Sequence, residues 1–310
     1  MRFTILAALC AVGANATVLA VAQTVGNEIV VTGKSEDEVR EQSRVFVRTV
    51  SATPVSGQFA RWKQPICPKT IGLKPENADV VTDKIRKVAL DAGAKVDDAE
   101  CVTNLLVVFT ADADRDIGIL RKKGSRVLGR VEPREAAMLA ESGRPVRWWY
   151  NTSIEGADGS QMNGMSAGTL TAKIEGNSGD VALSGGLMSN GETQALDGYN
   201  SSNIGSRIRA KIDRATFIID ANAAKGRTLK SFAAYAALVT LARIRMDSAV
   251  DSEDSILGLF AESEAGADDL TRRDKAFLAA LYSAPANRDA KVQERAIANA
   301  MAKALLANQP

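Results

Sequence analysis

Two continuous apolar runs constrain the fold of this chain more than any other feature of its sequence. Residues 104–110 read NLLVVFT, and residues 215–220 read ATFIID. Such runs are typical of buried strands, whose two faces are both covered by other parts of a protein. Helical patterns lie between and after them, and strands that alternate with helices form layered structures. The sequence therefore predicts an α/β or α+β fold with a mixed sheet packed against helices.

Capping residues mark the helix boundaries. A Ser or Thr followed three residues later by an acidic residue forms a capping box, as Ser35 does with Glu38 and Thr271 does with Asp274. Proline suits the first turn of a helix, and glycine suits its end. These signals predict helices over residues 35–50, 75–93, 133–141, 228–242, 271–282 and 289–306. A further strand is expected at residues 144–150, and an edge strand or an extended segment is expected at residues 60–68.

The segment from Gly156 to Gly205 differs in composition from the rest of the chain. It holds eleven of the 24 glycines, together with many serines and asparagines. This glycine content excludes a helix and favours a long surface loop or an irregular β excursion. We therefore expect a single domain over residues 23–310, with residues 156–205 as a flexible or irregular β insertion.

The first 22 residues have the pattern of a secretory signal peptide. Arg2 supplies a positive charge, an apolar stretch follows, and Ala20-Val21-Ala22 forms an A-x-A cleavage site. An uncleaved membrane anchor is the alternative, which the internal Asn15 and the small residues disfavour. We expect an exported protein, periplasmic or else extracellular, with no membrane span after the signal is removed.

Two cysteines, Cys67 and Cys101, remain after the signal, which contains Cys10. An even pair in an exported protein predicts a disulfide, because oxidising compartments favour such bonds. The bond would close a loop of about thirty residues and contribute about 3 kcal/mol to stability on the loop-entropy model. Two buried free thiols are the alternative.

Residues 28–33, which read EIVVTG, resemble the start of mature TonB-dependent receptors from the outer membrane of alphaproteobacteria. The chain is far too short to be such a receptor. The resemblance implies only an origin in a Gram-negative envelope. The alternative is a short β-branched strand that ends at Gly33.

The region from Thr216 to Tyr282 resembles the catalytic core of zincin-type metallopeptidases, matrixins in particular. Such cores place a strand, a long helix, a tight turn and a closing helix in this order. The matching segments are ATFIID, LKSFAAYAALVTLAR, Ser255-Ile256-Leu257, and the helix that ends in Leu281-Tyr282. Apolar residues cover much of the circumference of the long helix, so we expect that helix to be buried.

The zinc ligands of that family are missing from this chain. The family's helix carries two histidines one turn apart and a glutamate that polarises the water. Here the helix offers Ser231, Tyr235 and Thr240, and the whole chain contains no histidine. The resemblance implies a peptidase fold without its chemistry, with no metal or other cofactor. An unrelated core helix with common cap signals is the alternative.

Acidic residues after the first apolar run form a candidate site. Asp112 and Asp114 follow the strand at residues 104–110, and α/β proteins bind ligands at such strand ends. Capping of the next turn, or a solvated loop, is the alternative. Residues 164–168 spell G-x-S-x-G, but a nucleophile elbow needs a histidine base, so we interpret this match as chance.

Aromatic residues beside arginines form a second candidate surface. Arg147 precedes Trp148 and Trp149, and Arg61 precedes Trp62. Such pairs can bind a ligand through cation–π contacts. Packing of the large rings into the core is the alternative.

Composition and charge exclude several functions. A net charge of +2 and an aromatic content of 5% give no footprint for nucleic acid. Without histidine, neither a histidine-ligated zinc peptidase nor a Ser-His-Asp hydrolase is possible. We expect a non-catalytic envelope protein that binds a peptide or protein partner in a degenerate peptidase-like cleft. The ATFIID strand would offer its edge to the partner, and Tyr235 would lie in the cleft wall.

Two alternatives to this binding function stay open. One is a hydrolase that uses Ser with Lys, or carboxylates, instead of histidine. The other is a structural protein of the envelope whose glycine-rich segment mediates assembly.

Overall fold

Strand β7 (Ile208–Asp220) lies at the centre of a mixed sheet, which has five strands among the residues that the structure describes. One edge of β7 pairs with β4 (Val146–Gly156) in antiparallel orientation. The other edge pairs in parallel with β1 (Arg61–Trp62) and then with β3 (Leu105–Thr110). Strand β2 (Pro68–Ile71) pairs in parallel with the far edge of β3.

The structure is a computed structural model. It describes residues 35–52, 55, 57–98, 100–122, 128, 131, 133–156, 208–222, 226–250, 253–261 and 266–307, and the backbone of residues 167–172 and 181–186.

Helices cover both faces of the sheet, and they are α2 (Pro75–Asp91), α3 (Ala113–Lys122), α4 (Pro133–Ala140) and α5 (Leu229–Leu241). Alternate side chains of a strand point to opposite sides. Val107 and Phe217 therefore belong to the core under α2 and α5, whereas Val108 and Ile218 belong to the core under α3 and α4. A strand covered in this way has no polar face, which explains the two continuous apolar runs. The predicted mixed α/β fold is confirmed.

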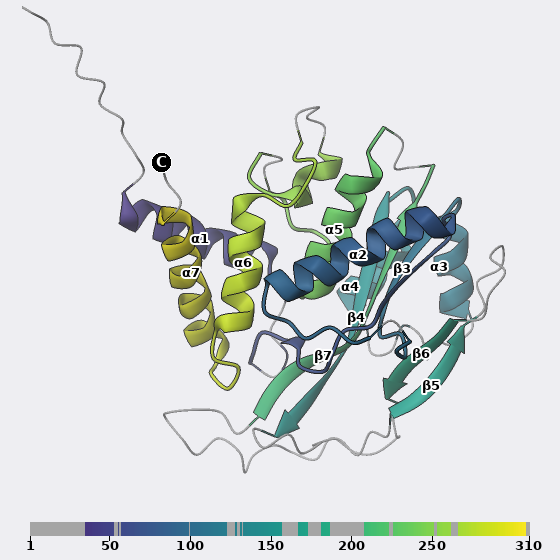
Figure 1. Cartoon of the computed structure of the whole chain (residues 1–310), viewed down its shortest axis with the longest axis horizontal. Helices are drawn as coiled ribbons and strands as arrows, with labels where there is room; N and C mark the ends of the chain where they lie inside the picture. The colour runs from purple at the N-terminus through teal and green to yellow at the C-terminus, as the bar shows by residue number, and fades with distance from the viewer. Residues whose placement is uncertain are drawn as a thin grey trace, which may run out of the picture. The chain divides into compact units, whose positions relative to one another are not determined.

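Three further helices pack beside one another, as Figure 1 shows: α1 (Glu36–Val50), α6 (Arg272–Ser283) and α7 (Ala290–Leu306). Phe46 of α1 packs edge-on against Phe277 of α6, with their ring centroids 5.8 Å apart. A short 3-10 helix, η1 (Ile256–Phe260), connects the end of the α5 region to α6 and packs against α5. Buried residues of all these elements continue the core under α2 and α5.

The two strands β4 and β7 are the arms of one long antiparallel ladder. Gly156 at the end of β4 faces Ile208 at the start of β7. The segment between them, residues 157–207, therefore begins and ends at the same end of the ladder. Within it, β5 (Ala167–Ala172) and β6 (Val181–Gly186) pair as antiparallel strands. The rest of the predicted insertion at 156–205 lies outside the described residues, as does the predicted signal peptide at 1–22.

Local capping chemistry places the helix starts where the sequence predicts them. The Ser35 hydroxyl accepts a hydrogen bond from the Glu38 amide at 3.2 Å, and Thr271 and Asp274 form a complete capping box on α6. Several predicted elements differ from the structure, and β4 and β7 extend well beyond the expected residues 144–150 and 215–220. The expected strand at 60–68 is divided between β1 and β2, because Pro65 cannot donate to a ladder. Helix α3 begins where the sequence suggested only a capped turn.

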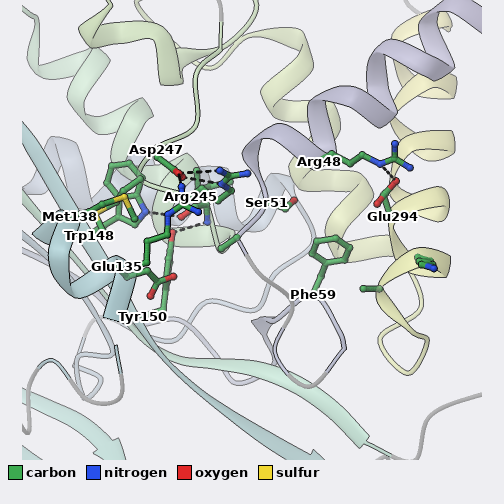
Figure 2. Close-up of a pocket in the computed structure, with 16 residues that line it drawn as sticks. Arg48, Ser51, Phe59, Glu135, Met138, Trp148, Tyr150, Arg245, Asp247 and Glu294 are labelled. Atoms are coloured by element: carbon green, nitrogen blue, oxygen red, sulfur yellow. Dashed lines mark hydrogen bonds and ion pairs between the residues drawn. The ribbon is translucent and has the colours of Figure 1, made fainter. Parts of the chain in front are cut away.

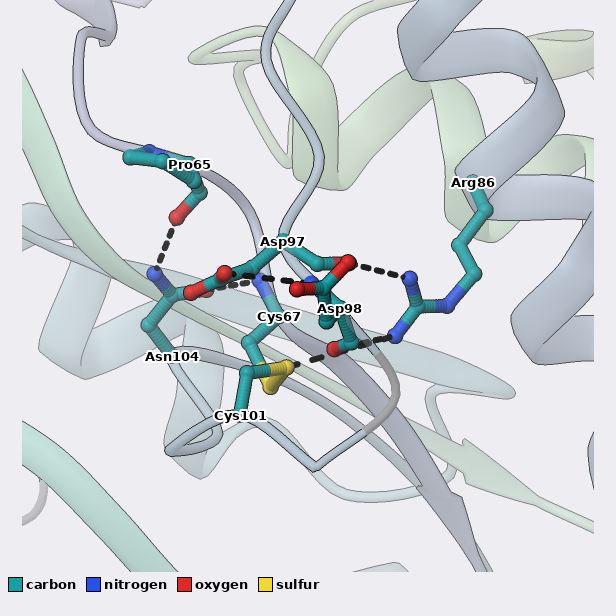
Figure 3. The surroundings of a disulfide bond; sticks show 7 residues. All are labelled: Pro65, Cys67, Arg86, Asp97, Asp98, Cys101 and Asn104. Atoms are coloured by element: carbon teal, nitrogen blue, oxygen red, sulfur yellow. Dashed lines mark hydrogen bonds between the residues drawn. A yellow bond between two sulfur atoms is a disulfide. The ribbon is translucent and has the colours of Figure 1, made fainter.

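The predicted disulfide between Cys67 and Cys101 is present, with the two Cα atoms 5.9 Å apart (Figure 3). Asn104 fixes the chain around Cys67: its Oδ1 accepts from the Cys67 amide at 2.8 Å, and its Nδ2 donates to the Pro65 carbonyl at 2.9 Å. Arg86 of α2 donates to the carbonyl of Asp97 at 2.6 Å on the other side. The bond thus ties the segment between β1 and β2 to the segment that leads into β3.

Candidate functional site

Tyr235, the residue expected in a cleft wall, lies inside the core. Its ring packs against Trp148, Phe217 and Phe260, at centroid distances of 5.9, 5.8 and 5.4 Å. Burial raises the pKa of its hydroxyl, so Tyr235 stays protonated. A partner on the surface cannot contact a side chain in this position, and Tyr235 contributes to packing instead.

The strand edge at ATFIID is not free either. Residues 215–220 of β7 pair with β3 on one side and with β4 on the other. A peptide that adds a strand to a sheet needs an edge with unpaired N–H and C=O groups. The expected main-chain pairing at this edge is therefore excluded.

The two tryptophans of β4 point to opposite faces of the sheet. Trp148 belongs to the core under α5, where its indole N–H donates to the Ile244 carbonyl at 2.9 Å. Trp149 belongs to the core under α3 and α4, beside Leu139 and Ile218. Both side chains are buried. They therefore pack in the core and do not form one aromatic-cationic surface with Arg147.

Asp112 caps helix α3. Its Oδ1 accepts a hydrogen bond from the Arg115 amide at 2.9 Å, and its carbonyl accepts from the Asp116 amide at 3.2 Å. An acidic side chain at a helix N-terminus is stabilised by the free N–H groups and by the helix dipole. This role matches the capping alternative that the sequence left open.

Asp114 joins α3 to the end of α4. Its carboxylate accepts from the Ser142 hydroxyl at 2.5 Å and from the Gly143 amide at 3.2 Å, and it pairs with the buried guanidinium of Arg147. The hydrogen bond from Ser142 is the main reason that the pKa of Asp114 lies below its usual value. Arg147 also donates to the Leu139 carbonyl near the end of α4 at 3.1 Å. These contacts are those of a structural ion pair.

The elements that resemble a zincin core occur in the expected order. Strand β7, helix α5, the 3-10 helix η1 and helix α6 follow one another along the chain. An order of elements carries no chemistry by itself. Among the described residues, no three Cys, Asp or Glu side chains come together as a group that could hold a metal ion. The resemblance stays a prediction.

A cavity of about 360 Å³ lies where α1, α4, β4 and α7 meet the segment after α5 (Figure 2). That segment is joined to the end of α1, since the Ala52 amide donates to the Arg243 carbonyl and the Arg245 amide donates to the Val50 carbonyl, each at 2.9 Å. The apolar part of the wall comes from half-buried side chains, namely Phe59, Met138 and Met246. Of the predicted site residues, Trp148 alone lines this cavity.

Ion pairs also line the cavity. The carboxylates in its wall are bound by arginines, in the pairs Arg48–Glu294 at 2.6 Å, Arg134–Asp247 at 2.5 Å, Arg245–Asp247 at 3.0 Å and Arg243–Glu135 at 3.1 Å. Hydrogen bonds from Arg245 are the main reason that the pKa of Asp247 is lowered. The Asp247 carboxylate is thus held in the ionised form, and Glu135 and Glu294 are bound by arginines as well, which suits binding better than the transfer of a proton.

Tyr150 of β4 also lines the cavity. Its hydroxyl lies 2.5 Å from the Val239 carbonyl oxygen and 3.0 Å from that of Ala242, and it accepts from the Ile244 amide at 3.0 Å. Burial raises the pKa of this hydroxyl, so it is no nucleophile at neutral pH. No sequence pattern predicted this site, because its walls come from segments that are distant in sequence. The nearby arginines Arg243 and Arg245 are the one signal that could have indicated it.

Comparison with known proteins finds no matching family model, no similar curated protein and no similar solved structure. Among the described helices, none has the length and apolar character needed to cross a membrane. The function is therefore argued from the geometry of the chain alone.

Proposed function

We propose that this protein is a non-catalytic, exported binding protein of the cell envelope, and that the cavity between α1, α4, β4 and α7 holds a peptide segment of a partner protein. The observation that carries the proposal is the composition of the cavity wall. Apolar side chains, among them Phe59, Met138 and Met246, line the cavity together with ion-paired charges. Binding sites for peptides combine an apolar pocket with a few placed polar groups in this way.

The mode of binding follows from the pairing of the sheet. Because β7 has no free edge near residues 215–220, the partner is held by side-chain contacts in the cavity. An apolar side chain of the peptide packs against Met138. The exposed ammonium group of Lys291 then pairs with an acidic residue of the peptide at the rim.

The hydrolase alternative has less support from this cavity. A hydrolase without histidine needs a carboxylate, or a Ser beside a Lys, that is free to take up a proton. Here Glu135, Asp247 and Glu294 are each paired with arginine. The serine that the sequence offers to a hydrolase, Ser166, lies among the residues that the structure does not describe. The assembly alternative concerns residues 156–205, most of which also lie outside the described residues.

Site-specific photocrosslinking in intact cells tests the proposal. A photoreactive phenylalanine analogue is placed at Met138 in one protein and at Leu90 in another, because Leu90 is an apolar residue on α2 with 61% of its surface exposed. We expect one envelope protein to be captured from position 138 and not from position 90. Equal capture from both positions, or none from position 138, contradicts the proposal.

A matched pair of charge variants adds a second readout. For this readout the photoreactive analogue is placed at Phe59, which also lines the cavity. Met138→Lys places an ammonium group in the cavity wall, and we expect it to reduce capture from position 59 at least tenfold, about 1.4 kcal/mol. Leu90→Lys makes the same change on an exposed helix face and leaves capture unchanged. Mass spectrometry of the captured partner also tests the hydrolase alternative, which predicts a cleaved peptide.

A further inference from the structure

A second cavity, of about 330 Å³, is lined by four basic side chains: Arg61, Lys63, Lys95 and Arg209. They come from β1, the turn after it, the loop after α2, and the start of β7. The end of α6 and the residues after it complete the wall with Tyr282 and Asn287. No carboxylate is among the described residues that line this cavity.

Arg61 is a buried cation with an incomplete set of partners. Only 3% of its surface is exposed, and its Nη1 donates to the carbonyls of Leu281 and, at 2.7 Å, of Ala284 at the end of α6. The partial negative charge of a helix C-terminus explains this contact, so Arg61 also caps α6. Its Nε and Nη2 are buried with no hydrogen-bond partner among the described residues. A buried guanidinium in this state is costly, which points to a counterion.

The other cations are close enough to repel one another. Burial lowers the pKa of Lys63, and the charges of Arg209, Arg61 and Lys95 lower it further. Glu155 acts in the opposite direction on Lys63. It faces Arg209 across the β4–β7 ladder and lies 3.9 Å from Lys211.

Among the described residues that act on Lys63, three cations thus oppose one carboxylate, that of Glu155. Like charges in a partly buried site raise its energy until an anion enters. A carboxylate ligand supplies one negative charge, whereas a phosphate group supplies up to two and accepts hydrogen bonds on several oxygens. Arginine side chains also match the geometry of phosphate oxygens.

We propose that this cavity is a binding site for a phosphate group, carried either by a small soluble phosphate or by the headgroup of a phosphorylated lipid. Lys63, Lys95 and Arg209 contact the phosphate oxygens, and Arg61 adds its charge from the floor of the cavity. This cavity shares no lining residue with the one proposed to hold a peptide. A failure of either proposal therefore leaves the other unaffected.

Titration calorimetry with inorganic phosphate, in a buffer of low ionic strength, tests the site on the mature protein. We expect saturable binding that weakens as sodium chloride is added. Lys63→Gln and Arg209→Gln should each weaken binding at least tenfold. Both side chains are partly exposed, so these variants are expected to fold, and circular dichroism checks that they do.

Lys275→Gln is the matched control. Lys275 is an exposed lysine on α6, nine residues before Ala284 and so about 14 Å away along the helix axis. Its loss removes one positive charge from the protein without touching the cavity. If phosphate does not bind, or if Lys275→Gln weakens binding as much as Lys63→Gln does, the proposal is overturned.

Flotation with vesicles distinguishes the two sources of phosphate. Vesicles of phosphatidylcholine with phosphatidic acid are compared with vesicles of phosphatidylcholine alone. Flotation that needs phosphatidic acid and is lost in Lys63→Gln supports a lipid headgroup. Phosphate binding in the calorimeter without flotation supports a soluble phosphate.

Discussion

Tyr150 and Tyr235 are both buried, yet their hydroxyl groups have different surroundings. The Tyr150 hydroxyl accepts from the Ile244 amide and lies against two carbonyls at the end of α5, whereas no hydrogen bond of the Tyr235 hydroxyl is found among the described residues. Tyr150→Phe leaves a buried amide without a partner, so we expect it to lower the free energy of unfolding by about 2 kcal/mol. Tyr235→Phe should change it by less than about 0.5 kcal/mol. Urea denaturation measures both, and equal losses contradict this assignment.

Asp274 is a fully buried carboxylate that joins α6 to η1. It accepts from the Ser255 hydroxyl at 2.5 Å and from the amides of Ile256 and Thr271, each at 2.9 Å. Asp274→Ala leaves these donors unpaired, and we expect a loss of about 3 kcal/mol in the free energy of unfolding. Asp274→Asn keeps one acceptor oxygen and should lose less. Urea denaturation at one fixed pH compares the two variants, and equal losses would argue against this hydrogen-bond role.

The same residue gives a pH dependence with a definite sign. Burial raises the pKa of Asp274 above its usual value, against the opposing effect of its hydrogen bonds. The folded state then binds the proton more tightly than the unfolded state does. The protonated Asp274 therefore contributes to the free energy of unfolding. This contribution is complete below the ordinary pKa of about 3.9, and it is lost as the pH rises through the pKa of the folded state. The stability of the wild type relative to Asp274→Asn should therefore fall as the pH is raised from 4 to 8, and a constant or rising difference would refute this.

The disulfide acts at the scale of elements, since it ties the chain before β2 to the chain before β3 across helix α2. Replacing both Cys67 and Cys101 by Ser should lower the free energy of unfolding by about 3 kcal/mol, because the unfolded chain gains the freedom of the opened loop. Urea denaturation with and without a reductant measures this. The reductant should shift the wild-type transition to the position of the double variant and leave the variant unchanged. An effect of the reductant on the double variant would mean that it acts elsewhere.

Elements whose signals are local could be predicted from the sequence. The box of Thr271 and Asp274 fixes the start of α6 through hydrogen bonds three residues apart, so the prediction needed no tertiary information. The second half of β4 carries no such signal. Its residues 151–155 are mostly polar and half-exposed, and they form a strand because β7 continues beside them. Strand formation of this kind depends on a partner strand that is distant in sequence.

At the scale of the whole molecule, the candidate sites were the part that sequence patterns described least well. The zincin resemblance predicts Tyr235, and the neighbouring Arg147 predicts Trp148 and Trp149, but a chain with 5% aromatic residues uses these three side chains in its core. The two cavities are instead defined by charges that converge from distant segments. Arg48 and Glu294 form an ion pair although they are 246 residues apart in the sequence, and no pattern of sequence spacing predicts such a pair.

The ladder of β4 and β7 also predicts how the chain between them can be shortened. Because Gly156 and Ile208 face each other, the ladder needs only a short turn to close in place of residues 157–207. We expect a variant in which a four-residue turn of Asn and Gly replaces residues 157–207 to keep a single cooperative unfolding transition. Its stability should be unchanged or higher by up to about 2 kcal/mol, since a shorter loop costs less entropy to close.

This deletion also separates the proposed functions. If the cavity beside α4 holds the partner, photocrosslinking from position 138 should survive the deletion, because none of the residues in the cavity wall is removed. Loss of capture in a variant that still unfolds cooperatively would shift the binding role to the glycine-rich segment and favour an assembly function. Loss of the cooperative transition itself would show that residues 157–207 complete the core of the sheet. Circular dichroism in urea, measured before any binding experiment, decides between these two failures.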